Sequence, residues 1–129
     1  MALVRGEMSD LLGALRGANM NSTADQAIPI QAFGLPYYVT SILAVWKSGA
    51  SLTLAAGGVY DAAAKAGNQL VSSAQVFSAL TGAGKALALT LAAAATGSTF
   101  TATSLFLSLT VAQGAAATCD IYVYGRVLD

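Results

Sequence analysis

The sequence predicts a single, mostly β domain folded as an antiparallel sandwich or barrel, with one or two short helices. Three observations favour this class. Three segments of the C-terminal half alternate large aliphatic residues with small or polar ones, further candidate strands lie upstream at short spacing, and helical signals are few. A chain of 129 residues is long enough for one core and short for two.

Residues 85–93, 104–111 and 119–127 carry their large aliphatic side chains at odd positions. In the second segment these are Leu105, Leu107, Leu109 and Val111, and in the third they are Cys119, Ile121, Val123 and Val127. A period of two places alternate side chains on one face of a strand. We therefore expect three strands with one face turned to a core, and we expect Cys119 to be a buried thiol.

Upstream strands are expected at residues 37–46 and 51–54. The first is rich in β-branched and aromatic residues on both phases, which predicts a central strand covered on both sides. The second alternates, with Leu52 and Leu54 inward, and the two segments are expected to form a hairpin. A shorter strand at 28–33 is interrupted by Pro29.

Two short helices are expected. Ser72 and Gln75 have the spacing of a capping box, and Val76, Phe77 and Leu80 follow at helical intervals before Gly82. Residues 7–16 have Met8, Leu11, Leu12 and Leu15 on one stripe. Residues 57–68 mix helical and strand signals and are expected to be irregular. Residues 1–27, which hold all three methionines, are expected to be an arm or peripheral helix preceding a β-sandwich domain of residues 28–129.

Composition argues against several functions. Charged residues make up 9% of the chain, the net charge is zero, and there is no histidine. Nucleic-acid binding therefore lacks its electrostatic driving force, and imidazole-based metal sites and general bases are absent. The scattered carboxylates suggest no catalytic pair, so no enzyme and no cofactor are expected. The longest apolar run, residues 86–95, is too short to span a membrane, and no secretory signal is recognisable, so we expect a soluble protein without a membrane partner.

No charged residue lies between Ala86 and Cys119, and the outer phase of the strands expected there is mostly Ala, Ser and Thr. Such faces are poorly guarded against association, so we expect another chain to cover part of them; a monomer with an alanine-rich surface is the alternative. Two groups are candidate interaction residues: Leu11, Leu12 and Leu15 of the N-terminal segment, and the row Tyr122, Tyr124 and Arg126 on the last strand. The row is either a recognition patch or a set of partly buried strand side chains.

Three motifs carry a resemblance to a known family: Gly57-Gly58-Val59-Tyr60, the segment QVFSAL at residues 75–80, and QGAAAT at residues 113–118 before a tyrosine-containing last strand. Over residues 36–129 the sequence resembles the small capsid cement, or decoration, proteins of tailed bacteriophages, in particular those of the Bordetella podophage type. The resemblance implies a jelly-roll-like β-sandwich without catalytic residues.

The resemblance also implies a place and partners. The protein would be made in the host cytoplasm and would form a homotrimer on the outer surface of an icosahedral capsid. There it would bridge capsomers of the major capsid protein at threefold and quasi-threefold positions. Two alternatives are another structural subunit of a phage head or tail, and a small β-barrel carrier of an apolar ligand.

Overall fold

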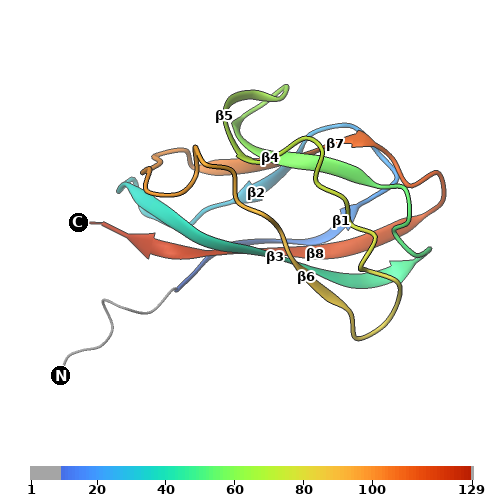
Figure 1. Ribbon diagram of the computed structural model, residues 1–129. Helices are drawn as coiled ribbons and strands as arrows, with labels where there is room; N and C mark the ends of the chain where they lie inside the picture. The colour runs from blue at the N-terminus through green and yellow to red at the C-terminus, as the bar shows by residue number, and fades with distance from the viewer. Residues whose placement is uncertain (1–9, 129) are drawn as a thin grey trace.

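A computed structural model describes residues 10–128, and this part of the chain contains eight strands and no helix. The strands are β1 (Asp10–Asn19), β2 (Gln26–Pro29), β3 (Tyr37–Gly49), β4 (Ala56–Ala62), β5 (Ala66–Val71), β6 (Ala86–Ala88), β7 (Ser104–Val111) and β8 (Ala117–Val127). They form two four-stranded antiparallel sheets that pack face to face (Figure 1). The expected mostly β sandwich is confirmed.

The strand order identifies the topology. One sheet has the order β1-β8-β3-β6 and the other has the order β2-β7-β4-β5. The first strand thus pairs with the last, the second with the seventh, the third with the sixth and the fourth with the fifth. This nested pairing is that of a long hairpin rolled up into two sheets, which is a jelly roll. The fold that the resemblance implies is therefore present.

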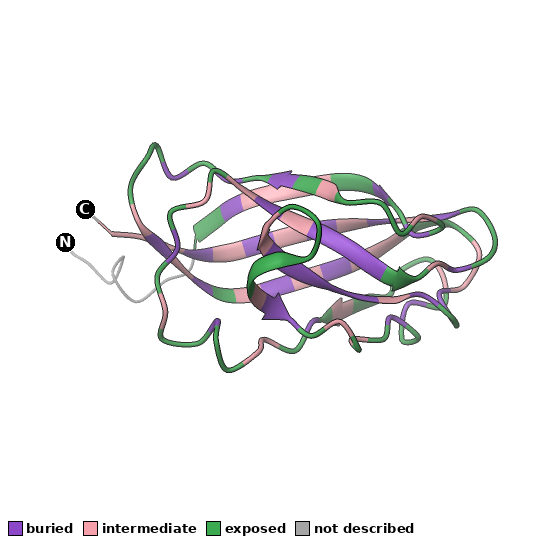
Figure 2. Cartoon of the chain, turned by 90° about the horizontal axis from the view of Figure 1, so that it is seen from above, coloured by how far each residue is buried: buried purple, intermediate pink, exposed green. Residues whose placement is uncertain are grey.

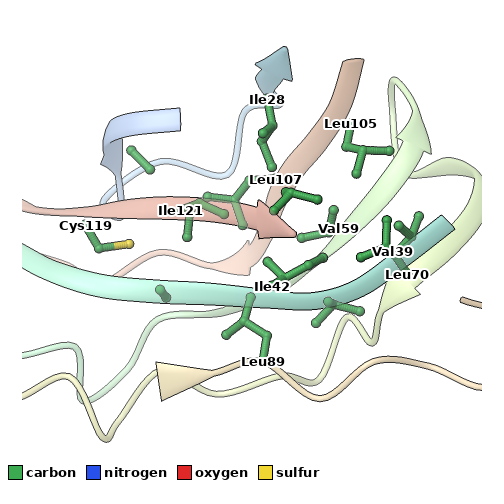
Figure 3. Close-up of a cluster of buried hydrophobic side chains, with 14 of the residues drawn as sticks. Ile28, Val39, Ile42, Val59, Leu70, Leu89, Leu105, Leu107, Cys119 and Ile121 are labelled. Carbon is green, nitrogen blue, oxygen red and sulfur yellow. The ribbon is translucent and has the colours of Figure 1, made fainter. Parts of the chain in front are cut away.

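The core lies between the two sheets and is filled by aliphatic side chains. Ile42 and Ile121 from one sheet face Val59 and Leu107 from the other, and all four are fully buried (Figure 3). Along the strands, buried residues alternate with more exposed ones (Figure 2). Cys119 is buried as expected, and burial together with the nearby charge of Asp120 raises the pKa of its thiol to about 12.

The alternating C-terminal segments form strands with the expected inward faces. Leu105, Leu107 and Leu109 of β7 are fully buried, as are Cys119, Ile121 and Val123 of β8. Val111 is an exception, because a bulge opposite Ala56 and Gly57 turns it to the outer face, where it is 48% exposed. The expected central position of residues 37–46 is also confirmed, since β3 lies between β8 and β6.

The helix expected at residues 7–16 is wrong where it can be examined. Residues 7–9 lie outside the described part, and residues 10–16 belong to β1, which pairs with β8 as an edge strand of the sandwich. Two bulges, between Leu11 and Gly13 and between Leu15 and Ala18, interrupt the alternation of β1. As a result the inward residues are Leu12, Leu15 and Ala18, three positions apart. A doubly bulged strand therefore has apolar spacing that resembles a helical stripe.

The helix expected at residues 72–82 is also wrong. Residues 72–82 contain two separate turns and no helix: the Gln75 N–H donates to the Ser72 carbonyl oxygen, and the Leu80 N–H donates to the Phe77 carbonyl oxygen. After the first turn the chain runs beside β4, where Val76 bridges to Ala56 and the N–H of Phe77 donates to the Ala55 carbonyl oxygen. Because Phe77 is buried by this extended pairing, its burial needs no helical turn.

Three other local expectations need correction. Residues 51–54 form a loop and no hairpin with β3, and Leu54 is exposed although Leu52 is buried. Residues 57–68, expected to be irregular, supply most of the β4–β5 hairpin. The segment 85–93 is a strand only at Ala86–Ala88, because the chain then crosses to the other sheet, where Leu91 bridges to Val71 of β5. Residues 28–33 similarly contribute only the end of β2.

The β4–β5 hairpin covers part of the outer face of its own sheet. Asp25, just before β2, accepts hydrogen bonds from the Ser108 hydroxyl (2.7 Å) and from the Ala64 amide N–H at the hairpin turn (2.6 Å). Ser108 of β7 is fully buried in consequence, and Tyr60 of β4 is 5% exposed. The chain itself thus covers Ser108 on the outer face of residues 104–111, and the expectation that another chain covers part of these faces stays a prediction.

Asp25 should release the hairpin turn in acid. The Ala64 amide and then the Ser108 hydroxyl, by bonding the carboxylate, hold the pKa of Asp25 below its ordinary value of 3.8. Because the pKa of Asp25 is lowered in the folded state, its two hydrogen bonds stabilise that state fully above pH 3.8. This stabilisation is lost as the pH falls through the native pKa. In an NMR titration, the Ala64 amide proton should move upfield with a midpoint below 3.8. Asp25→Asn should abolish this change in the Ala64 chemical shift. A midpoint at or above pH 3.8 would contradict a hydrogen bond between the Asp25 carboxylate and the Ala64 N–H.

Candidate interaction face on the β1-β8-β3-β6 sheet

Tyrosines and aliphatic residues lie on the outer face of the β1-β8-β3-β6 sheet, on the side away from the core. One row crosses all four strands, because Tyr122 of β8 lies opposite Ala14 of β1 and Leu43 of β3, and Leu43 lies opposite Ala88 of β6. Tyr124 begins the next row and is paired with Leu11 and Ser41. We call this surface the aromatic face; its residues are Leu11, Ala14, Tyr38, Leu43, Val45, Ala86, Ala88, Tyr122 and Tyr124.

Charged side chains lie at the two ends of the aromatic face. At one end, Asp120 of β8 lies 3.7 Å from the Lys47 ammonium group and accepts a hydrogen bond from the Gly17 N–H at 2.7 Å. At the other end, Arg126 is paired with Tyr38. The intervening rows of Tyr122 and Tyr124 contain no charged residue. The cross-strand rows at the centre of the face are therefore built of uncharged residues, and charged side chains lie at its two ends and beside Tyr122, where Arg16 of β1 approaches the ring. A mostly apolar centre with a polar periphery is the usual anatomy of a protein interface.

Tyr122 is held in a defined position on this face. The Arg16 guanidinium lies 5.9 Å from the centroid of its ring, which is within the range of a cation–π contact. Its hydroxyl lies 3.4 Å from an Asp120 carboxylate oxygen. A ring fixed in this way loses little conformational freedom when a partner covers it, so Tyr122 is suited to be an interface anchor.

The structure separates the candidate residues that the sequence suggested. Tyr122, Tyr124 and Arg126 share the outer side of β8, and all three are half-buried. Leu11 joins them, since it lies opposite Tyr124 and is 54% exposed. The other two leucines face inward: Leu12 is 3% exposed, and Leu15 packs against the core. Leu12 and Leu15 are therefore core residues and no part of an interaction surface.

Sequence reasoning missed three members of the aromatic face, Tyr38, Leu43 and Val45 of β3. Apolar residues on both phases of this strand were expected to be covered on both sides, but only one side faces the core. On the outer side, Tyr38, Leu43 and Val45 are half-buried. Apolar residues on both phases of a strand do not show whether its outer face is covered by the same chain or by another one.

The aromatic face offers aromatic rings, aliphatic side chains and tyrosine hydroxyls for contact with a partner. Within residues 10–128, no three acidic or cysteine side chains lie close enough together to hold a metal ion. No helix of that same range has the length and apolar character needed to cross a membrane. Comparison of the chain with protein-family models, with curated proteins and with solved structures finds no match.

Proposed function

We propose that this protein is a structural virion subunit that decorates and stabilises the capsid of a tailed bacteriophage. The observation that carries the proposal is the aromatic face, whose central rows of uncharged residues extend across four strands. The jelly roll agrees with what the sequence resemblance implies, although a fold by itself does not define a function. In this proposal the aromatic face docks on the major capsid protein.

The proposed assembly is a homotrimer on the outer surface of the capsid, at threefold and quasi-threefold positions. Burying about 800 Å² on each partner at roughly 25 cal/mol per Å² of apolar area gives a gross gain of at most about 20 kcal/mol for each of the two surfaces, before the costs of association are subtracted. In a trimer, docking of one subunit raises the effective concentration of the other two at the shell. Three modest contacts therefore combine into firm attachment across capsomers.

The interior of the sandwich does not favour a carrier of an apolar ligand. Leu105, Leu107 and Leu109 of β7 and the side chains that face them are fully buried and occupy the space between the sheets (Figure 3). A carrier would need a cavity there instead of packed side chains. Decoration of a phage shell therefore remains our proposal.

A charge at the centre of the aromatic face should abolish docking. Tyr124→Glu places a carboxylate where no charge occurs, and loss of an interface anchor costs at least about 2 kcal/mol, so we expect capsid affinity to fall at least about 30-fold. The measurement is co-sedimentation with purified capsids that lack the protein.

Ala27→Glu is the matched control. It adds the same charge at an exposed position of β2, on the outer face of the other sheet, and should leave binding unchanged. Thermal unfolding of both variants checks that the sandwich is intact. If Tyr124→Glu binds capsids as tightly as the original protein, the aromatic face is not the docking surface.

A further inference from the structure

The loop between β2 and β3 ends in a turn that presents a phenylalanine to solvent. The Leu35 amide N–H donates to the Ala32 carbonyl oxygen at 2.9 Å, which closes a tight turn with Phe33 and Gly34 at its two central positions. Phe33 is 89% exposed, more than any other large hydrophobic side chain of the described chain. Leu35, two residues on, is also exposed.

The backbone of this turn is unfavourable for phenylalanine. Phe33 has φ +56° and Gly34 has φ +79°, so both central residues are left-handed, as in a type I′ turn. Asn, Asp and Gly are the residues that favour this conformation. In a hairpin such a turn matches the twist of the paired strands, but β2 and β3 belong to different sheets and are not paired. Neither pairing nor burial within the chain thus explains Phe33.

A hollow lies beside the turn. It has a volume of about 390 Å³, and Phe33 itself forms part of its lining. The other apolar lining residues are Ile30, Ala32, Leu35 and Ala102, the polar ones are Gln31, Thr101 and Thr103, and none is charged. A cavity of about 150 Å³ already accommodates a benzene ring, so a phenyl side chain fits in this hollow. The exposed Phe33 ring therefore borders a largely apolar hollow that has room for a second ring.

The base of the hollow is held in place before any partner arrives. The Ile30 N–H donates to the Thr103 carbonyl oxygen at 2.9 Å, and Tyr37 and Phe100 exchange two backbone hydrogen bonds. The Tyr37 hydroxyl donates to the Ala102 carbonyl oxygen at 2.7 Å, and its ring packs against Phe100 with the centroids 6.2 Å apart. A preformed receptacle avoids the ordering cost that weakens association.

We propose that the Phe33 turn is the contact by which copies of this chain hold one another: the Phe33 ring of one copy occupies the hollow beside the same turn of the next copy. Because the ring and the hollow are adjacent, one region of each copy both inserts its own Phe33 ring and accepts the ring of a neighbour. Repeated around a threefold axis, the contact closes a ring of three with no ring or hollow left over. This inference deepens the proposed function, on which it rests for the number of copies.

Sedimentation of the isolated protein tests the contact from nanomolar to about 100 µM. We expect the original protein to be a trimer and Phe33→Asn to be a monomer, with a dissociation constant raised at least about 100-fold. Asn adopts the left-handed conformation readily, so the substitution should not lower the free energy of unfolding of a single subunit. Thr101→Trp, which fills the hollow from an exposed position, should also give a monomer.

Leu54→Asn is the matched control, since it removes another exposed hydrophobic side chain and should leave the trimer intact. Leu54 belongs to the β3–β4 loop, which lies at the end of the sandwich opposite the β2–β3 loop (Figure 1). A Phe33→Asn protein that keeps the original oligomeric state would overturn the contact, as would an original protein that is monomeric throughout. The proposed function fails separately: a Phe33-dependent trimer that binds no capsid would refute decoration and leave the contact standing. A monomeric protein that binds capsids would refute the Phe33 contact and leave decoration standing.

Discussion

Replacing Gln113 with Leu should lower the free energy of unfolding by about 2–4 kcal/mol. Gln113 follows β7 and is 6% exposed. Its side-chain oxygen accepts hydrogen bonds from the Leu54 N–H (2.9 Å) and from the Ala55 N–H (3.0 Å). Leucine has a similar size but accepts no hydrogen bond, so both backbone donors lose their partner. The Ala55 N–H is buried and the Leu54 N–H is part-buried, and a buried donor left unpaired costs about 1–3 kcal/mol.

The expected effect is large because Gln113 joins three loops at one end of the sandwich. Its side-chain NH2 group donates to the Thr53 hydroxyl at 3.2 Å, and its backbone N–H donates to the Met20 carbonyl oxygen at 2.9 Å. The loops after β1, β3 and β7 therefore meet at this residue. The backbone bond to Met20 remains in the variant, so the loss should come from the side chain alone.

Denaturant unfolding at one fixed protein concentration measures this effect. Gln69→Leu is the control, because the Gln69 side chain donates only to the Tyr60 hydroxyl and its loss leaves no backbone group unpaired; we expect a cost below about 1 kcal/mol. Gln113→Glu keeps an oxygen that can accept both backbone hydrogen bonds and loses the NH2 donor to Thr53, so its cost should fall between those of the two leucine variants. Equal destabilisation by the two leucine variants would show that the backbone donors find other partners.

The parts of the fold that the sequence predicted well are those in which local alternation coincides with burial. β7 and β8 are regular over most of their length, so Leu107 and Ile121 could be assigned to the core from spacing alone. β1 could not, because its two bulges are set by its register with β8, a pairing between opposite ends of the chain. Spacing therefore suggested a helix where long-range pairing makes a strand.

The candidate site shows the same division. The row of Tyr122, Tyr124 and Arg126 follows from the alternation of a single strand and was predicted. Its neighbours Leu43 and Leu11 come from strands far away in sequence, and only the sheet order places them beside it. The Phe33 turn was missed because nothing in the local sequence separates an exposed phenylalanine from a buried one. What distinguishes Phe33 is a positive φ together with high exposure, and both are properties of the folded structure that the sequence does not show.

Gly125 shows how such a long-range constraint restricts one residue. It lies on the inward phase of β8, between Asp10 of β1 and Val39 of β3. A Cβ atom at this position would lie against the Tyr38 carbonyl oxygen, well inside van der Waals contact, and 2.8 Å from Cδ1 of Leu12. Leu12 reaches this point because the first bulge of β1 turns it inward.

Gly125→Ala should therefore destabilise the protein by about 3 kcal/mol or more, since the backbone of β3 must move to admit one methyl group. Gly82→Ala, with nothing within 4 Å of the added atom and no positive φ, should change the free energy of unfolding by less than about 0.5 kcal/mol. Gly114→Ala, equally open but at φ +88°, should cost about 1 kcal/mol for its conformation alone. Denaturant unfolding of the three variants separates steric from conformational cost. If Gly125→Ala costs no more than Gly114→Ala, the strands around it are not packed as closely as this structure requires.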